Sequence, residues 1–258
     1  MTTGCVGEIF SGIQGEGLLV GERQVFIRLL GCNLRCAYCD TAWARERALG
    51  PASRAARAER TAGRRDFAEH ANPLEAVHTA ELTLRLDAPR GLHGWASFTG
   101  GEPLLQPEFV REVAWRVRSA GLRAYLETNG TLAAPLAQVQ DVVDAVAMDV
   151  KLPSAAGVEC WQAHAAFLAA ARALVERSAL FVKAVFADTT TEQEIERLCR
   201  LIAGVRAEVA LVLQPVTQVN GGPAPPSPGR MLALQAHAKR WLRQVRVIPQ
   251  MHKLMGQM

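Results

Sequence analysis

Three cysteines, Cys32, Cys36 and Cys39, lie within the ten-residue segment GCNLRCAYCD at 31–40. A structural zinc site usually takes four ligands, with a second cysteine pair downstream, but the next cysteine here is Cys160. A disulfide switch requires only two thiols. A [4Fe–4S] cluster binds cysteine thiolates, and three of them leave one iron open to a small molecule. The spacing therefore favours an iron–sulfur cluster, with zinc completed by an aspartate or a distant histidine as the alternative.

A glycine-rich segment, TGGEP at 99–103, has residue types that can hold an ammonium group. Its two glycines permit a close approach of the backbone, and the Glu102 carboxylate can pair with a cation. Polar residues also end three other apolar runs, as ETNG at 127–130, DVK at 149–151 and QPVTQ at 214–218. Any one of these motifs is typical of a turn or cap. Four in series favour one ligand site, because parallel α/β sheets bind ligands at the carboxyl ends of their strands.

The elements that must position these residues follow from apolar periodicity. Length and content predict strands at 25–30, 95–98, 124–127, 145–150, 181–187, 209–214 and 245–248. Helices are predicted at 107–120, 161–177, 190–203 and 229–243. Strands that alternate with helices imply parallel pairing and right-handed crossovers. The predicted fold class is α/β, as a partial (β/α)6-type barrel of parallel strands.

The chain is predicted to form a single domain over 1–258, because (β/α) barrels reach this size. Residues 43–72 are rich in Arg and Ala and poor in large apolar side chains, which predicts an insertion, partly a solvated helix and partly a mobile loop. Residues 217–229 form a turn-rich connection, and 250–258 form a C-terminal tail.

Composition narrows the class of protein. Apolar residues make up 49% and charged residues 21% of the 258, as in ordinary globular domains. The formal charge of +4 is weak evidence for a nucleic-acid surface. No apolar run approaches the ~20 residues that span a bilayer, and the start MTTGCVGEIF lacks the pattern of a signal peptide. We therefore expect a cytoplasmic protein with neither a membrane nor a nucleic-acid partner, in which the isolated Cys5, Cys160 and Cys199 are bystanders.

The spacing C-x3-C-x2-C, directly after the first predicted strand, resembles the signature of the radical S-adenosylmethionine (SAM) superfamily. TGGEP stands where that superfamily carries a glycine-rich motif for the SAM amino group. The flank EIFSGIQGEGLLVGERQVFIRLLGCNLRCAYCDT, residues 8–41, closely resembles the 7-carboxy-7-deazaguanine synthases of queuosine and 7-deazapurine biosynthesis. The resemblance continues through FTGGEPLLQ, YLETNGT, MDVK, LVLQPV and VIPQMHK, and so covers most of the chain outside 43–90 and 217–229.

The resemblance implies a lyase that contracts the ring of 6-carboxy-5,6,7,8-tetrahydropterin to 7-carboxy-7-deazaguanine with loss of ammonia. It implies a [4Fe–4S] cluster, SAM used as a cofactor, and Mg²⁺. Its partners would be the small pterin substrate and an electron donor such as flavodoxin or ferredoxin, and the chain would form a homodimer. No side chain is predicted as catalytic, because the cofactor carries the radical chemistry.

The same resemblance implies the site residues. The cluster would be held by Cys32, Cys36 and Cys39, and magnesium, which prefers oxygen ligands, by Thr41. SAM would be bound by Tyr38, Asp40, Gly101, Glu102, Glu127, Thr128, Asn129, Asp149, Lys151 and Gln214. The substrate would be bound by Ile13, Gln14, Gly15, Glu16, Arg28, Thr99 and Pro249. This agrees with the chemistry, since a pterin edge suits Gln and backbone groups and a carboxylate suits a bidentate Arg.

Some of these residues have other interpretations. Arg28 interrupts the apolar run VFIRLL, and the alternative to a substrate contact is an internal ion pair, with Glu16 as the candidate partner. Lys151 can be an ion-paired lysine and Glu127 an end-of-strand cap. Pro249 matches a position that ends the chain beside the substrate in some relatives. Here the chain continues, so His252 or Lys253 is a candidate for the role of that terminal carboxylate, unless 250–258 is a mobile tail.

Two other functions remain open at this stage. A glycyl-radical-enzyme activase has the same cysteine spacing but acts on a protein, and the IQGEG segment and Arg28 argue against it. A zinc-stabilised nucleic-acid-binding module would use the Arg-rich segment as its basic patch.

Overall fold

The structure is a computed structural model that describes residues 2–46, 54–88, 91–177, 179–219 and 221–257. In these residues a ten-stranded sheet has the order β12-β11-β10-β9-β8-β7-β3-β2-β4-β5. A separate strand pair joins β1 (Thr3–Gly4) to β6 (Leu74–Glu75). The strands of the large sheet are β2 (Val6–Ile13), β3 (Arg23–Leu29), β4 (Ala56–Glu59), β5 (Phe67–His70), β7 (Trp95–Gly100), β8 (Arg123–Thr128), β9 (Ala145–Lys151), β10 (Leu180–Phe186), β11 (Leu211–Pro215) and β12 (Val245–Val247).

The parallel part of the sheet confirms the predicted α/β fold. β3, β7, β8, β9, β10, β11 and β12 pair in parallel, each with the next. Each of the seven predicted strands corresponds to one of them. β3 and β7 are neighbours, with Ile27 opposite Phe98 and Leu29 opposite Gly100, so the segments that follow them leave the sheet side by side.

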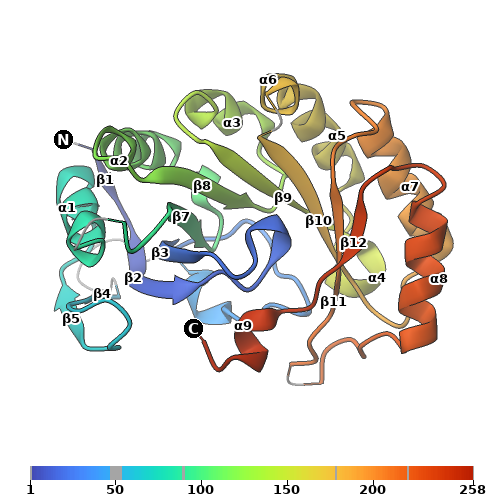
Figure 1. Ribbon diagram of the computed structural model, residues 1–258, viewed down its shortest axis with the longest axis horizontal. Helices are drawn as coiled ribbons and strands as arrows, with labels where there is room; N and C mark the ends of the chain where they lie inside the picture. Colours follow the sequence, from blue (N-terminus) through green and yellow to red (C-terminus); the bar gives the residue numbers. More distant parts are fainter. Residues whose placement is uncertain (1, 47–53, 89–90, 178, 220, 258) are drawn as a thin grey trace.

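Helices cover the outer face of the curved sheet, as Figure 1 shows. Helix α2 begins at Pro107 and buries Val110, Val113 and Val117 against the strands, as its periodicity predicted. The predicted helix at 161–177 is two helices, α5 and α6, and the one predicted at 229–243 ends earlier. The helices are α1 (Ala76–Leu86), α2 (Pro107–Ser119), α3 (Ala133–Val139), α4 (Pro153–Ala156), α5 (Trp161–Ala170), α6 (Arg172–Glu176), α7 (Glu192–Ala203), α8 (Pro228–Ala238) and α9 (Met251–Leu254).

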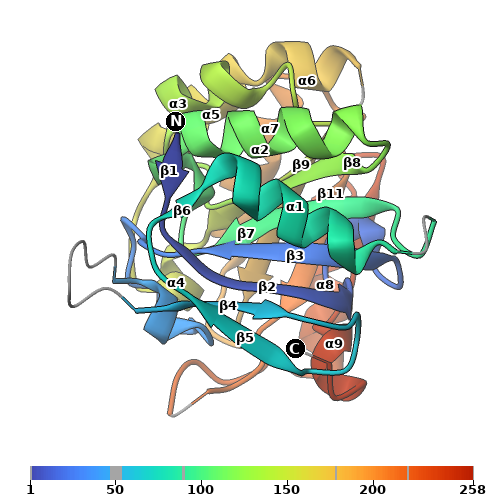
Figure 2. The ribbon, with the colours of Figure 1, turned by 90° about the vertical axis from the view of Figure 1, so that its left-hand side faces the viewer.

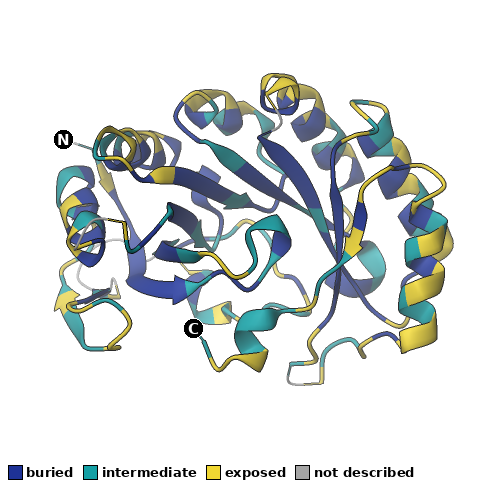
Figure 3. Cartoon of the chain, in the orientation of Figure 1, coloured by how far each residue is buried: buried dark blue, intermediate teal, exposed yellow. Residues whose placement is uncertain are grey.

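The core lies between the strands and this helical layer. Val146, Val182 and Leu211 on three adjacent strands are fully buried together with Phe167 and Leu198 from the helices. Figure 3 shows the central strands of the sheet mostly buried and the helices that cover the sheet exposed mainly on their outer faces. Among the helices of the described residues, none has the length and apolar character needed to cross a membrane.

The segment 43–72 differs from its prediction. Residues 56–70 form the antiparallel hairpin β4–β5 rather than a solvated helix, while 47–53 lie outside the described residues. β4 extends the large sheet by pairing with β2, and Figure 2 shows the hairpin at the sheet edge near α9. The prediction rested on a composition rich in Arg and Ala and poor in large apolar side chains. Pairing to the sheet edge outweighed it, with Ala56 and Ala58 buried and Arg57 stacked 4.4 Å from the Phe67 ring.

Candidate functional site

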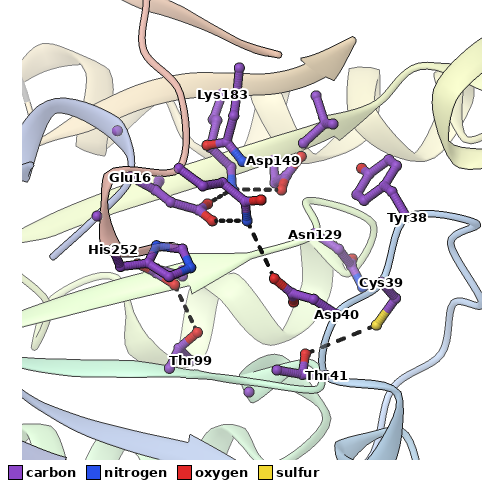
Figure 4. A pocket seen from close by; sticks show the side chains of 18 of the residues that line it. Glu16, Tyr38, Cys39, Asp40, Thr41, Thr99, Asn129, Asp149, Lys183 and His252 are labelled. Carbon is purple, nitrogen blue, oxygen red and sulfur yellow. Dashed lines mark hydrogen bonds and ion pairs between the residues drawn. The ribbon is translucent and has the colours of Figure 1, made fainter. Parts of the chain in front are cut away.

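A cavity of about 440 Å³ lies on the inner face of the sheet and at the carboxyl ends of its parallel strands. Its lining comes from the β2–β3 connection, the segment after β3, the ends of β7, β8, β9 and β11, and α9. Figure 4 shows side chains from these distant segments pointing toward one another. The volume and the mixture of apolar and charged groups suit a small, polar organic ligand.

Nearly all of the residues predicted from the sequence line this cavity. The exceptions are Glu102 and Pro249. The predicted residues that line it are Ile13, Gln14, Gly15, Glu16, Arg28, Cys32, Cys36, Tyr38, Cys39, Asp40, Thr41, Thr99, Gly101, Glu127, Thr128, Asn129, Asp149, Lys151 and Gln214.

The cysteine loop follows β3 and is tied to its surroundings by backbone groups. Gly31 opens it with φ of 97°, a conformation that favours glycine. Within the loop the Cys39 amide donates to the Cys36 carbonyl at 3.2 Å, and the Arg45 guanidinium donates to the same carbonyl at 2.8 Å. Burial raises the pKa of the Cys36 thiol, and the nearby Lys151 ammonium opposes this. The loop therefore presents its thiols to a partly buried part of the cavity, near the Lys151 ammonium.

The arrangement of the thiols fits a cluster. Cys32, Cys36 and Cys39 line one cavity, yet no three His, Cys, Asp or Glu side chains in the described ranges are grouped as ligands of one metal ion. In a [4Fe–4S] cluster the cysteine thiolates are on different irons, so they surround the group instead of converging on a point. The Thr41 hydroxyl, 4.0 Å from the Cys39 sulfur, adds an oxygen of the kind that Mg²⁺ binds.

The atoms predicted to face SAM include several without a protein partner. In the part of the chain that the structure describes, the Tyr38 hydroxyl, Asp149 Oδ1 and Gln214 Oε1 are buried and make no hydrogen bond. Buried polar atoms are normally satisfied, so unpaired ones in a cavity indicate groups that a ligand completes. SAM carries ribose hydroxyls and an ammonium group that can donate to two of these oxygens.

Glu102 lies behind the cavity wall instead of in it. Its carboxylate is fully buried and accepts hydrogen bonds from the Leu104 amide at 2.9 Å, the Thr128 hydroxyl at 2.8 Å and the Asn129 amide at 2.7 Å. Burial raises its pKa, and these donors oppose the shift. Glu102 thereby holds the end of β8, where Thr128 and Asn129 line the cavity.

Residues predicted for the substrate are linked to the strand ends by hydrogen bonds. The Gln14 amide donates to Glu127 Oε1 at 2.7 Å, and the Thr99 hydroxyl donates to Glu127 Oε2 at 2.7 Å. Burial and then the charge of Glu16 raise the pKa of Glu127. Glu127, predicted as a SAM contact, therefore bonds to two residues of the predicted substrate set.

Arg28 has an acidic neighbour, but not the one considered from the sequence. Its Nε lies 3.6 Å from Glu8 Oε2 on the adjacent strand β2, whereas Glu16 pairs with Lys183. The Arg28 guanidinium also stacks 5.7 Å from the Phe10 ring and lines the cavity. Because Nε makes no hydrogen bond within the described residues, the guanidinium keeps donors for a ligand.

A chain of charges crosses the floor of the cavity. Lys183 contacts both Glu16 and Asp149 Oδ2, the latter at 3.0 Å, and Lys151 contacts the same Asp149 oxygen at 3.0 Å. Lys151 also lies 5.4 Å from the centre of the Tyr38 ring. Burial acts to raise the pKa of Glu16, but Lys183 outweighs it and holds that pKa at about 2. Glu16 is therefore an ionised carboxylate at any physiological pH.

Helix α9 closes one side of the cavity. The Met251 amide donates to the Gly15 carbonyl at 2.9 Å, and the Gln250 amide nitrogen donates to Glu16 Oε1 at 2.7 Å. The Lys253 ammonium pairs with Asp40 Oδ2 at 2.8 Å. Pro249 lies just before this helix and does not line the cavity, whereas Gln250, His252 and Lys253 do.

Sequence reasoning missed Lys183 and Gln250. Lys183 interrupts the apolar run FVKAVF as Arg28 interrupts VFIRLL, so the same signal was available for it. Gln250 carried no comparable signal, because a glutamine after a proline near the end of a chain is unremarkable until the tail docks.

Comparisons with known proteins agree with this geometry. The family model of the radical SAM superfamily matches residues 26–202. A 7-carboxy-7-deazaguanine synthase of Geobacter sulfurreducens is 42% identical over 97% of this chain and 96% of that protein. One of Archaeoglobus fulgidus is 32% identical over 96% of each. The crystal structure of QueE from Escherichia coli matches the fold with a TM-score of 0.61 at 20% identity, covering 97% of this chain and 95% of that one.

Proposed function

This chain belongs to the radical SAM superfamily and, within it, to the 7-carboxy-7-deazaguanine synthases, and we propose that its cavity converts 6-carboxy-5,6,7,8-tetrahydropterin to 7-carboxy-7-deazaguanine with loss of ammonia. It is a radical SAM enzyme, with a [4Fe–4S] cluster and SAM as cofactors. The observation that carries the substrate assignment is the position of the IQGE segment and Arg28. Both line the same 440 Å³ cavity as the three cysteines.

The residues around SAM act by binding and orientation. When bound, the reduced cluster and SAM supply a 5′-deoxyadenosyl radical that abstracts a hydrogen atom from the substrate. Cys32, Cys36 and Cys39 would hold the cluster. The unpaired oxygens of Asp149 and Gln214 would accept hydrogen bonds from SAM. The remaining proposed contacts are Tyr38, Asp40, Gly101, Glu127, Thr128, Asn129 and Lys151, with Glu102 acting through the end of β8.

The residues on the substrate side recognise a flat, amide-rich ring with a carboxylate. Arg28 would bind the carboxylate, because its guanidinium can donate two parallel hydrogen bonds to it. Gln14, Glu16 and Thr99 offer donors and acceptors to the ring edge, and Ile13 and Gly15 offer backbone groups. Thr41 would provide an oxygen ligand for Mg²⁺. Pro249 would act by placing α9 against the cavity.

The finer features of the enzyme are also proposals. We expect one domain over 1–258, a homodimer, a cytoplasmic location, and reduction of the cluster by a flavodoxin or ferredoxin. Family resemblance supports these features.

An anaerobic assay tests the proposed function. The reconstituted protein is incubated with SAM, dithionite, Mg²⁺ and 6-carboxytetrahydropterin, and products are identified by mass spectrometry. We expect 7-carboxy-7-deazaguanine from the wild type and none from Cys36→Ala. Formation of 5′-deoxyadenosine without that product would contradict the substrate, and bound zinc without iron would contradict the cluster.

A further inference from the structure

Lys183 is a largely buried lysine on β10, which lies between β9 and β11 in the large sheet. Its side chain is 13% exposed and lines the cavity, and in the sheet it is registered opposite Asp149 of β9. It belongs to neither set of proposed ligand contacts. An ammonium is costly to bury without partners, and two carboxylates compensate this cost for Lys183.

These contacts join the two halves of the site. Lys183 pairs with Glu16, in the segment proposed for the substrate, and with Asp149, in the set proposed for SAM. Figure 4 shows its side chain between the two carboxylates. Lys151 also bonds to Asp149, but among the described residues the structure gives it no bond to Glu16. Lys183 is therefore the direct ionic link between the two sets in the described part of the site.

Each carboxylate keeps a second oxygen for another role. Asp149 Oδ1 is buried and makes no hydrogen bond in the described ranges, while Oδ2 receives both lysines. Glu16 Oε1 accepts from Gln250, which immediately precedes α9, and Oε2 faces Lys183. A ligand hydroxyl that donates to Asp149 Oδ1 would fix this carboxylate and, through Oδ2, the ammonium of Lys183. A fixed ammonium in turn orients Glu16.

We propose that Lys183 is a positioning residue that couples the binding of SAM to the binding of the pterin substrate, by holding Glu16 in the orientation that Asp149 sets. The proposal rests on the proposed function. The coupling is positive, because the ligand that binds first orders the Asp149–Lys183–Glu16 chain and the second ligand binds to a chain that is already ordered. Coupling of this kind is reciprocal, so each ligand must raise the affinity for the other by the same factor.

A purely structural role would give a different result. If Lys183 only balanced the charge of buried carboxylates, its removal would lower the stability of the fold or the affinity for each ligand separately. The ratio between the affinity for one ligand with and without the other would stay unchanged. The coupling factor is thus the quantity that separates the two explanations.

The experiment measures SAM binding to the cluster-loaded enzyme by equilibrium dialysis without a reductant, so that SAM is not cleaved. The dissociation constant is determined with and without saturating 6-carboxytetrahydropterin, and the reverse titration checks reciprocity. We expect about 5-fold or greater coupling in the wild type, within the range typical of coupled sites. Lys183→Met should reduce the factor to below about 2-fold, and Lys183→Arg, which keeps the charge, should restore much of it.

The exposed Lys239 at the end of α8 provides the matched control, and Lys239→Met should couple as the wild type does. The proposal is overturned if Lys183→Met shows the same coupling factor as the wild type. It is also overturned if the wild type binds both ligands with a coupling factor of one. If Lys183→Met binds neither ligand, Lys183→Arg is the deciding variant. If Lys183→Arg binds both ligands without coupling, the proposal is overturned. A wild-type enzyme that binds SAM but not the pterin contradicts the proposed function itself, and is recognised as such because SAM still binds.

Discussion

At the scale of single residues, two arginines form ion pairs with one carboxylate but have different surroundings. Arg28 and Arg57 both approach Glu8, at 3.6 and 3.3 Å. Arg28 lines the cavity, whereas Arg57 stacks on Phe67 in the hairpin outside it. The ion pair alone therefore does not distinguish a ligand-binding arginine from a structural one. The surface that each guanidinium faces does.

Arg28→Lys should raise KM for the pterin by about 10-fold or more, because a lysine cannot make the parallel pair of hydrogen bonds to a carboxylate. The SAM dissociation constant should change by less than about 2-fold. Steady-state kinetics and SAM binding check the two expectations. Arg57→Lys is the matched control and should leave KM unchanged. Equal effects of the two substitutions would show that the pair with Glu8, not the substrate, requires the guanidinium.

At the scale of elements, α9 reaches the cavity because the β2–β3 connection accepts it closely. A Cβ added at Gly15 would collide with the backbone nitrogen and the ring of His252. The Met251 amide bonds to the Gly15 carbonyl, and the Lys253–Asp40 pair ties the other side of the helix to the cysteine loop. A four-residue helix has little stability of its own, so these contacts hold it in place.

Gly15→Ala should displace α9 and lower kcat/KM for the pterin by about 10-fold or more, since a 1 Å misplacement at a site can cost two orders of magnitude. In a chain truncated after Gln250 the same substitution should have little further effect, because His252 is gone. Kinetics of the four proteins form the test. Gly229→Ala, where an added Cβ meets nothing within 4 Å, is the control. Full additivity of Gly15→Ala and the truncation would contradict this account.

Helix α5 is attached to the end of β8 through a buried histidine. His164 is fully buried, and its Nε2–H donates to the Asn129 carbonyl at 3.2 Å. Burial lowers the pKa of His164 to about 4. The folded state therefore holds a neutral imidazole at pH values at which the unfolded chain, with a pKa of about 6.5, already binds a proton.

The free energy of unfolding should consequently fall as pH decreases from about 6.5 toward 4. At pH 4 this histidine alone should lower it by about 3 kcal/mol relative to neutral pH. Above pH 6.5 its contribution is constant. In His164→Gln the unfolding free energy should depend less on pH in this window. Denaturant unfolding of both proteins at pH 4.5, 5.5, 6.5 and 7.5 measures the difference. Parallel pH curves for the two proteins would contradict a neutral buried histidine.

At the scale of the whole molecule, the core and the cavity are separate. The main apolar cluster lies between the sheet and the helices, whereas the cysteine loop lies beyond the end of β3. The strands are therefore stabilised without the iron–sulfur cluster. The parallel order β3-β7-β8-β9-β10-β11 brings their polar ends to one edge. The fold thus provides a rigid frame, and its ligands complete the site.

Removal of the cluster with a chelator should lower Tm by only a few degrees and leave cooperative unfolding intact. It should abolish the stabilisation by SAM, which at 100 times its dissociation constant adds about 2.7 kcal/mol to a protein with an intact site. Thermal unfolding followed by circular dichroism, with and without SAM, checks both statements. Loss of cooperative unfolding on chelation would show that the cluster is part of the folding core.

The cysteine triad, the seven parallel strands and most residues that line the cavity could be predicted from the sequence. The cysteines follow from metal-ligand spacing and the strands from apolar periodicity, and parallel pairing predicts that the polar strand ends meet. The individual site residues were implied by the family resemblance. The hairpin β4–β5 could not be predicted, because its segments lack an apolar strand pattern and β4 joins the sheet by pairing with β2, which is distant in sequence.

The tertiary structure alone decided which charges meet. Arg28 is beside Glu8 and not Glu16, Glu16 is paired with Lys183, and Glu102 faces Thr128 and Asn129 behind the cavity wall. These choices depend on register across strands and on the docking of α9, over separations of up to 234 residues between Gln250 and Glu16. Short-range patterns carry the identity of the chemical groups, but the partner of a buried charge is set by which segments the packed core brings within hydrogen-bond distance.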